Sequence, residues 1–275
     1  MTDPARAFTS SGWRDVDATG DAEFYLRYLD RAAASPALRA ARREIISALE
    51  VRPDSSVLDV GSGAGEFLIE LAEAVPGIRA VGIDPSETLV STAKSRAEAA
   101  GMAVQFSLGD AERLEFPDSS FDRVHCSRVL QHLDHPEIAV REIARVLSSG
   151  GRAAIIEPDF DILMVDSDDL ATSTAVRKQL ISGLRNPDIG RRLRRLVLDA
   201  GLTVTDLTAP ALGPPNLAIA KAQFGLFDHL DAAVAAGDVS AEAAAAWRVW
   251  LEASDARGRL FVASVAVRVV AEKPI

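Results

Sequence analysis

The chain has 275 residues, a formal net charge of −10 and a pI near 5.0, so a phosphate backbone or an anionic membrane surface would be repelled overall. Its one cysteine, Cys126, excludes an internal disulfide framework and a cysteine-based metal site, and no metal is expected. No apolar run approaches the roughly 18 residues of a membrane span, and residues 1–20 hold no signal-peptide core. We therefore expect a soluble, cytoplasmic protein without nucleic-acid or membrane partners.

Residues 1–20 are polar and rich in turn formers, and we expect them to be mobile or a loose flap. Apolar residues at helical spacing over 21–49, interrupted at Ser35-Pro36, predict two helices. Strand and helix patterns then alternate strictly, which is typical of a parallel sheet covered by helices on both faces. The predicted strands are 57–60, 80–83, 104–108, 123–126 and 152–157, and the predicted helices are 66–74, 87–100 and 136–147.

The alternation ends after Glu157. Helices are expected over 168–184 and 186–200, followed by strands at 204–207 and 260–270 that close the sheet. Between these last two strands lies 214–257, which is Ala-rich and apolar at helical spacing where a hairpin would suffice; insertions of this length are usually functional. The expected fold class is α/β, with a seven-stranded, mostly parallel sheet, an N-terminal helical flap (1–50) and a helical cap (214–257) inserted between strands six and seven.

The stretch VLDVGSGAGEF (57–67) places Gly61, Gly63 and Gly65 directly after the first strand of the alternating region. Glycines at such a turn allow the backbone to approach a ligand closely. The spacing is Gly-x-Gly-x-Gly, and Gly65 is followed by Glu66 rather than by Lys-Ser/Thr. Neither the pyrophosphate of a dinucleotide nor a phosphate loop is therefore favoured.

Three acids follow the strands at the same edge. Asp59 precedes the first glycine and indicates a cationic group nearby. Asp84 ends the second strand, where a carboxylate typically accepts both hydroxyls of a ribose, and Asp110 follows the third strand, where it can accept from the exocyclic amine of adenine. Ribose, adenine and an ammonium group without phosphate describe S-adenosylmethionine. The structural alternatives are a loop cap at Asp59, a helix N-cap at Asp84 and a plain turn at Asp110.

Four stretches carry a family resemblance: VLDVGSGAGEF, GIDPS, GDAERLEFPDSSFDRVHCSRVLQHLDHP and EIARVLSSGGRAAIIEP. In this order they resemble the class I S-adenosylmethionine-dependent methyltransferases, and most closely the ubiquinone/menaquinone-biosynthesis-like group that acts on small molecules. The resemblance implies a Rossmann-like methyltransferase core (51–213 and 258–275) with S-adenosylmethionine as cofactor. It implies that the glycine loop lines the methionine moiety, that Asp59 serves the amino group directly or through water, that Asp84 holds the ribose and that Asp110 holds the adenine. The cofactor-binding residues are then expected to be Asp59, Gly61, Ser62, Gly63, Gly65, Asp84, Pro85, Asp110, Ala111, Ser127 and Arg128, with Arg128 able to touch either cofactor or substrate.

Placing a nucleophile in line with the methyl group does most of the catalytic work, and a base helps only when the nucleophile carries a proton. His132, just past the fourth strand, is the best-placed imidazole; its alternative is a packing role. Glu157 and Asp159 leave the fifth strand at the mouth of the sheet and could bind a cationic group, act as base, or serve only as turn acids. Tyr25 and Tyr28 share a helix face, so one could close over the methyl donor, or both could merely pack the helix pair.

The leading hypothesis is methyl transfer to a hydrophobic small-molecule acceptor such as a quinone, polyketide, terpenoid or indole, in natural-product metabolism. The insertion offers apolar side chains for an acceptor pocket, Phe224 and Trp247 among them. Alternatives are a cyclase or pericyclase that binds the cofactor without methyl transfer, a quinone-biosynthesis C-methyltransferase, and a non-catalytic sensor. The insertion could equally form an oligomer interface. The acceptor, the atom methylated and the use of a base are left open at this point.

Overall fold

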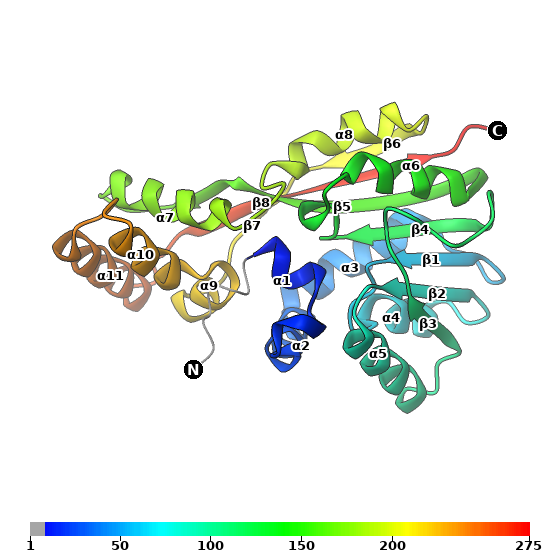
Figure 1. The fold of residues 1–275 in the computed structure, drawn as a ribbon, viewed down its shortest axis with the longest axis horizontal. Helices are drawn as coiled ribbons and strands as arrows, with labels where there is room; N and C mark the ends of the chain where they lie inside the picture. Colours follow the sequence, from blue (N-terminus) through cyan, green and yellow to red (C-terminus); the bar gives the residue numbers. More distant parts are fainter. Residues whose placement is uncertain (1–8) are drawn as a thin grey trace.

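A computed structural model describes residues 9–275 of the chain. The molecule is elongated, with a larger lobe built on a sheet and a smaller helical lobe, and two long strands run from one into the other (Figure 1). The described chain begins with α1 (Ser10–Arg14), η2 (Asp17–Thr19), α2 (Ala22–Ala34) and α3 (Pro36–Leu49). The two helices predicted for 21–49 are confirmed, and Pro36 occupies the first turn of α3, where its missing N–H costs nothing.

The expectation of a loose flap is wrong for residues 9–20, which we call the N-terminal strap. Val16 is only 1% exposed and packs with Tyr25 and Leu89. The physical reason is local capping combined with a few large side chains: Thr9 accepts from the N–H of Gly12 and so starts α1. Residues 1–8 of the expected flap lie outside the described residues.

The alternating region follows the predicted order. Its elements are β1 (Ser56–Val60), α4 (Glu66–Ala74), β2 (Arg79–Asp84), α5 (Glu87–Ala99), β3 (Val104–Leu108), β4 (Phe121–Ser127), η3 (Leu130–His132), α6 (Pro136–Val146) and β5 (Leu147–Val165). β5 is much longer than the strand expected at 152–157, because β8 pairs with it from Arg152 to Val165 and supplies ladder partners beyond Pro158.

The C-terminal part returns to the sheet after a helical excursion. Its elements are α7 (Leu170–Ser182), α8 (Ile189–Asp199), β6 (Thr203–Thr208), β7 (Ala211–Leu212), α9 (Leu217–Phe224), α10 (Leu226–Ala235), α11 (Ala241–Ala256) and β8 (Val262–Glu272). The strand order is β3-β2-β1-β4-β5-β8-β6, with β8 antiparallel to both neighbours. The α/β, mostly parallel class is confirmed; β7 adds a two-residue strand against β8 that the seven-stranded expectation lacked.

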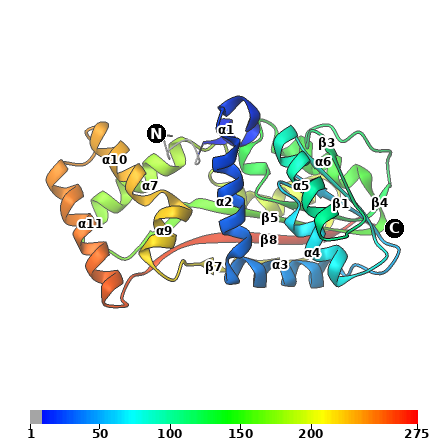
Figure 2. The same cartoon turned by 90° about the horizontal axis from the view of Figure 1, so that it is seen from below.

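Helices cover both faces of the sheet, as Figures 1 and 2 show. The cluster around Leu58 and Val60 joins the sheet to α6 and α8, and a second cluster around Val57 joins it to α3, α4 and α5. The helical lobe has a separate core in which Phe224 and Trp247 are each 1% exposed. These two side chains therefore stabilise the lobe itself and are enclosed by it, which corrects their expected place on a pocket wall. No helix in residues 9–275 is both long and apolar enough to cross a bilayer.

Candidate functional site

The glycine loop joins β1 to α4 and is tied to the end of β2. The backbone N–H groups of Gly61 and Ser62 both donate to the carbonyl of Ile83, at 2.9 and 2.8 Å. All three glycines have positive φ, the left-handed region that side chains disfavour. A Cβ at Gly61 would collide with Val129, and one at Gly65 would lie 2.9 Å from the Phe106 ring. Protein neighbours thus already require two of the glycines.

Gly63 is the exception in this loop. A Cβ there would meet only Leu29, at an ordinary 3.4 Å. Its N–H donates to Asp84 Oδ2 at 2.9 Å, while Ser86 N–H donates to Oδ1 at 3.0 Å. Burial raises the pKa of Asp84 to about 6 against the opposing effect of these two hydrogen bonds, and the negative charge of Asp59 raises it further. A buried carboxylate held beside the loop is suited to accept further donors such as ribose hydroxyls.

The remaining residues expected at the cofactor surround this pair less tightly. Asp110 is exposed and its carboxylate accepts from the N–H of Glu112 at 2.8 Å, a turn contact that leaves oxygen free for an amine. Ala111 is buried beneath it, and Pro85 is exposed beside Asp84. Ser127 ends β4, partly buried, at the same edge of the sheet.

Arg128 follows Ser127 in a strained conformation. Its φ is +60°, in the left-handed region that non-glycine residues rarely adopt. Its N–H donates to the carbonyl of Ile156 in the neighbouring strand, and its side chain is exposed at the mouth of the sheet. Its charge reaches His132 and Glu157, since it lowers the pKa of both groups.

Asp59 has a protein partner that its expected role did not include. Its register partner across the sheet is His125 on β4, and His125 Nδ1 lies 2.7 Å from Asp59 Oδ1. The imidazole stacks on Phe67 with ring centroids 3.6 Å apart. All three side chains are buried. Asp59 is therefore already paired within the protein, and a contact with a ligand's amino group would be additional to this pairing.

Glu157 does not lie free at the mouth of the sheet. Its side chain is fully buried, and Oε1 accepts from the N–H groups of Val129 and Leu130 at 2.7 Å each. These donors form the start of η3, which carries His132. Burial raises the pKa of Glu157 to about 7, although these hydrogen bonds oppose the rise. The geometry makes Glu157 a support for η3 rather than an exposed acid, but Oε2 has no hydrogen-bond partner in residues 9–275, so the role of Glu157 as a base stays a prediction.

Asp159 is likewise occupied. It is fully buried and pairs with Arg191 of α8, which donates through Nε at 2.6 Å and through a terminal nitrogen at 2.7 Å. The pairing with β8 carries β5 on past this point, so Asp159 lies within the strand rather than at its exit. The expected base or cation-binding role at the mouth is therefore wrong for Asp159, which joins β5 to α8.

His132 lies in η3 at the mouth, facing the N-terminal strap. Trp13 of the strap stacks over its ring, with centroids 6.1 Å apart and planes 28° apart. Ser10 Oγ lies 3.4 Å from Nδ1. Burial lowers the pKa of His132 to about 3, and the positive charge of Arg128 lowers it further. The imidazole is therefore neutral at physiological pH and can accept or donate a hydrogen bond without carrying charge.

The strap and α2 supply aromatic rings to the same place. Trp13 meets Tyr25 and Tyr28 edge to face, with centroids 4.8 and 5.4 Å apart. The two tyrosines share one face of α2, as predicted, and Tyr25 is buried whereas Tyr28 is partly exposed. The other end of the strap reaches α5, where Asp17 accepts from the N–H of Glu87 at 2.7 Å. The strap thus spans from η3 to the residues that follow Asp84.

Ser10, Trp13 and Asp17 were missed by sequence reasoning. The signal for Trp13 was present, since it is a large aromatic residue in an otherwise polar stretch, SSGWRDVDATG. Nothing in the local pattern indicates that Ser10 meets a residue 122 positions away.

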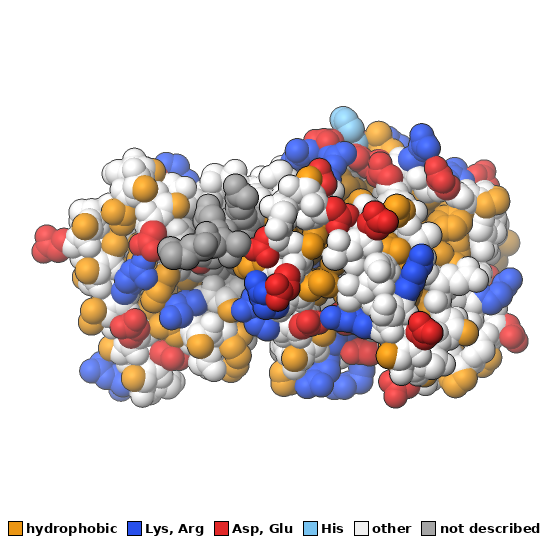
Figure 3. All heavy atoms as spheres, turned by 60° about the horizontal axis from the view of Figure 1, so that its bottom comes forward, with side chains coloured by type: hydrophobic (Ala, Val, Ile, Leu, Met, Phe, Trp, Pro, Cys, Tyr) orange, Lys and Arg blue, Asp and Glu red, His pale blue; other side chains and the backbone are white. Residues whose placement is uncertain are grey.

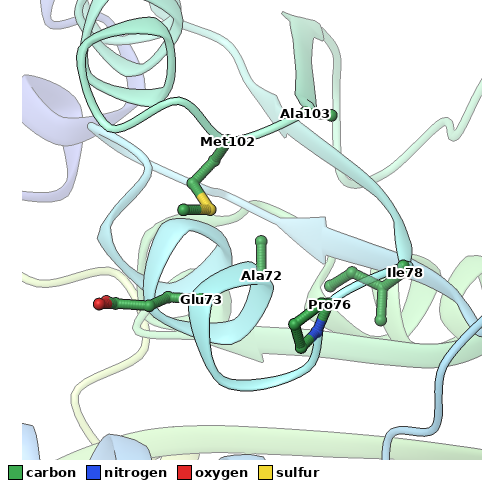
Figure 4. A pocket seen from close by; sticks show the side chains of 7 residues that line it. Ala72, Glu73, Pro76, Ile78, Met102 and Ala103 are labelled. Carbon is green, nitrogen blue, oxygen red and sulfur yellow. The ribbon is translucent and has the colours of Figure 1, made fainter.

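A pocket elsewhere is lined by apolar side chains and Glu73 at the amino ends of β2 and β3, opposite to this site (Figure 4). On the face shown in Figure 3, acidic and basic side chains are interspersed.

Comparisons with known proteins agree with this geometry. A methyltransferase-domain family model matches residues 58–155. An uncharacterized 37.1 kDa protein in transposon TN4556 of Streptomyces fradiae is 39% identical over 252 residues, which cover 89% of this chain and 70% of that protein. The ubiquinone/menaquinone biosynthesis C-methyltransferase UbiE of Ectopseudomonas mendocina is 33% identical over 175 residues, 57% of this chain and 68% of that one.

Solved structures share the fold. The crystal structure of YcgJ from Bacillus subtilis matches with a TM-score of 0.61 and 22% identity, over 86% of this chain and 99% of that one. The [4+2]-cyclase SpnF matches with a TM-score of 0.56 and 23% identity, over 88% and 85%.

A Rossmann-like sheet with a glycine loop and a buried carboxylate at its carboxyl edge is typical of enzymes that bind a nucleoside cofactor. The chain belongs to the class I S-adenosylmethionine-dependent methyltransferases, and S-adenosylmethionine is its cofactor. The residues present fit this group: Asp84 is a buried carboxylate beside the open Gly63, and no phosphate-binding lysine follows the loop.

Proposed function

We propose that the protein transfers the methyl group of S-adenosylmethionine to a hydrophobic small molecule that is held between the mouth of the sheet and the helical lobe. The observation that carries the proposal is that the hydrogen-bonded pair of Asp84 and Gly63 and the imidazole of His132 both follow parallel strands at the carboxyl edge of the sheet. Trp13 of the strap stacks on His132 and meets Tyr28 of α2. Such a site has a polar end for the cofactor and an apolar, water-poor end for the acceptor.

Each residue has a distinct task in this proposal. The cofactor, when bound, supplies a sulfonium methyl group that is open to in-line attack. Asp84 accepts the ribose hydroxyls, the loop from Gly61 to Gly65 lies along the methionine moiety, and Asp110 with Ala111 borders the adenine. His132 accepts the proton of the nucleophile, and Trp13 with Tyr28 excludes water from the reacting centre.

The acceptor pocket is proposed to be apolar because of the side chains that border the helical lobe. Phe24, Phe160 and Phe227 pack against the edge of that lobe's core and are only partly buried. They replace Phe224 and Trp247 as candidates for contact with the acceptor. The similarity to UbiE supports a quinone-like or other natural-product acceptor.

The proposal is tested with the purified chain, S-adenosylmethionine labelled in the methyl group, and a panel of hydrophobic metabolites that carry hydroxyl, amine or acidic carbon sites. Transfer of label to a panel member, detected by mass spectrometry, is the expected result. The matched control is His132→Gln, which keeps a polar side chain but removes the base. Tight cofactor binding with no labelled product from any acceptor class would count against methyl transfer.

A second candidate is supported by the similarity to the [4+2]-cyclase SpnF. In that case S-adenosylhomocysteine would replace S-adenosylmethionine without loss of turnover, whereas methyl transfer would stop.

We also propose that the insertion can form an oligomer interface. Val249 of α11 is 64% exposed and would lie in such an interface. Light scattering of the parent and Val249→Glu tests it.

A further inference from the structure

The hydroxyl of Ser10 meets three groups from two other segments. It accepts from the backbone N–H of Arg185 at 2.9 Å, lies 3.2 Å from the carbonyl oxygen of Gln131, and lies 3.4 Å from Nδ1 of His132. Gln131 and His132 belong to η3, whereas Arg185 lies in the loop between α7 and α8. Ser10 is 3% exposed; its contact with Gln131 is buried, and those with Arg185 and His132 are partly buried.

The single hydrogen of this hydroxyl determines whether His132 donates or accepts in its contact with Ser10. A serine hydroxyl has one hydrogen to donate and two lone pairs to accept with. Arg185 N–H occupies one lone pair. A carbonyl oxygen can only accept, so the 3.2 Å contact with Gln131 takes the hydrogen. One lone pair is left for the contact with Nδ1 of His132, so in this arrangement Nδ1 is the donor.

We propose that Ser10 is a positioning residue that holds His132 in the Nδ1–H tautomer, so that the unprotonated Nε2 takes the proton of a hydroxyl acceptor. This inference rests on the proposed function and deepens it, because it names the acceptor as a compound that presents an O–H group. The 3.4 Å contact is long, as catalytic hydrogen bonds often are before the ligands bind.

The surroundings of Nε2 suit this role. In residues 9–275 no hydrogen-bond partner of Nε2 is found, and Nε2 is not among the unpaired side-chain atoms that are fully buried. Trp13 covers the ring, so a group that reaches Nε2 leaves most of its water behind. An acceptor oxygen that gained the methyl group would form an O–C bond while the C–S bond of the donor broke and left its electron pair on sulfur. The electron pair of the acceptor's O–H bond would stay on oxygen, and the Nε2 lone pair would form the new N–H bond. Because burial and Arg128 lower the pKa of His132 to about 3, the imidazolium is short-lived and returns this proton to water.

The tautomer can be measured directly on the full chain. Protein labelled with 15N in its four histidines is examined at neutral pH by long-range 1H–15N correlation, and the signals of His132 are assigned with His132→Gln. The expected spectrum shows a proton-bearing Nδ1 and an unprotonated Nε2. In Ser10→Ala the acceptor for Nδ1–H is gone, and the signals should shift toward the Nε2–H form. Ser11→Ala is the matched control, since Ser11 is exposed and the hydrogen bond found for its hydroxyl within residues 9–275 goes to Thr9.

Two results would overturn the inference: an Nε2–H signal for His132 in the parent, or an unchanged Nδ1–H signal in Ser10→Ala. The parent spectrum is informative even if the variant folds poorly. S-adenosylhomocysteine is titrated into the same samples by calorimetry; absence of binding to the parent would count against the proposed function and leave the tautomer result standing. With a working acceptor, Ser10→Ala should lower kcat by about 10²-fold at an unchanged KM for the cofactor, and Ser11→Ala should change neither.

Discussion

Asp84→Asn is the substitution that separates cofactor binding from stability most clearly. Asp84 is buried, and its raised pKa of about 6 means that it is ionised in only about one molecule in eleven at pH 5. Ribose hydroxyls donate to the ionised form. The apparent Kd for the cofactor should therefore be about tenfold higher at pH 5 than at pH 8.

The asparagine variant should lose both the tight binding and this pH dependence. A hydrogen bond to a charged group contributes about 1.5–3 kcal/mol, so the variant should bind about 10- to 100-fold more weakly at pH 8. The effect on stability should be opposite in sign, with the variant more stable than the parent near neutral pH. Because the folded pKa lies above the ordinary value of 3.8, the folded protein binds more protons between about pH 4 and 6, and stability falls by about 3 kcal/mol as the pH rises through this range. Asparagine does not titrate, so the variant should not lose this stability as the pH rises.

Calorimetric titration with S-adenosylhomocysteine from pH 5 to 8 measures the affinity, and urea unfolding over the same range measures the stability. Asp122→Asn is the matched control, since Asp122 likewise accepts two hydrogen bonds, here from the backbone N–H and the hydroxyl of Ser56, but at the amino end of β1. Its cofactor affinity should equal that of the parent. A pH-independent Kd in the parent, or parent-like binding by Asp84→Asn, would refute the assignment of Asp84 to the ribose.

Other changes address the loop, the helical lobe and the two acids of β5. Gly63→Val should abolish the rise in Tm that S-adenosylmethionine causes, because a β-branched residue is strained at φ +54°; NAD should cause no rise in either protein. Trp247→Ala should cost about 3–5 kcal/mol in urea unfolding with cofactor affinity unchanged, since the ring fills the lobe's own core. Asp159→Asn should cost stability near the low end of the roughly 3–5 kcal/mol range for broken buried pairs, since Arg191 is half exposed; weakened cofactor binding would contradict this. The raised pKa of Glu157 implies that the parent loses about 3 kcal/mol of unfolding free energy as the pH rises from about 4.5 to 7, and Glu157→Gln should not show this loss. Urea unfolding across that range measures it, and an unchanged pH profile in the variant would count against a buried ionisable acid.

The order of elements was predictable from the sequence because hydrophobic periodicity and turn residues are local signals. The glycine loop and Asp84 lie at strand ends that are close together in any parallel sheet, so their meeting follows from the topology. The length of β5 was not predictable in the same way. Its extension past Pro158 depends on β8, which lies about a hundred residues later and supplies the ladder.

The misplacement of Glu157 and Asp159 has the same origin. A strand expected to end at 157 would leave both acids at its exit, whereas the longer strand encloses them. Each buried carboxylate then needs donors, which come from η3 for Glu157 and from Arg191 for Asp159. Neither set of donors has a fixed sequence spacing to the acid, so no local pattern could indicate them.

The cofactor half and the acceptor half of the candidate site differ in how they depend on tertiary contacts. This explains why the cofactor half could be predicted from the sequence and the acceptor half could not. The cofactor half uses backbone conformation at Gly63 and one carboxylate, both fixed by the strands that precede them. The proposed acceptor half depends on the strap, which brings Ser10 and Trp13 to His132 from more than a hundred residues away. A family motif can retain the first half while the second half changes with the N-terminal sequence. Acceptor specificity should therefore be sought in residues 9–28 and the border of the helical lobe rather than in the glycine motif.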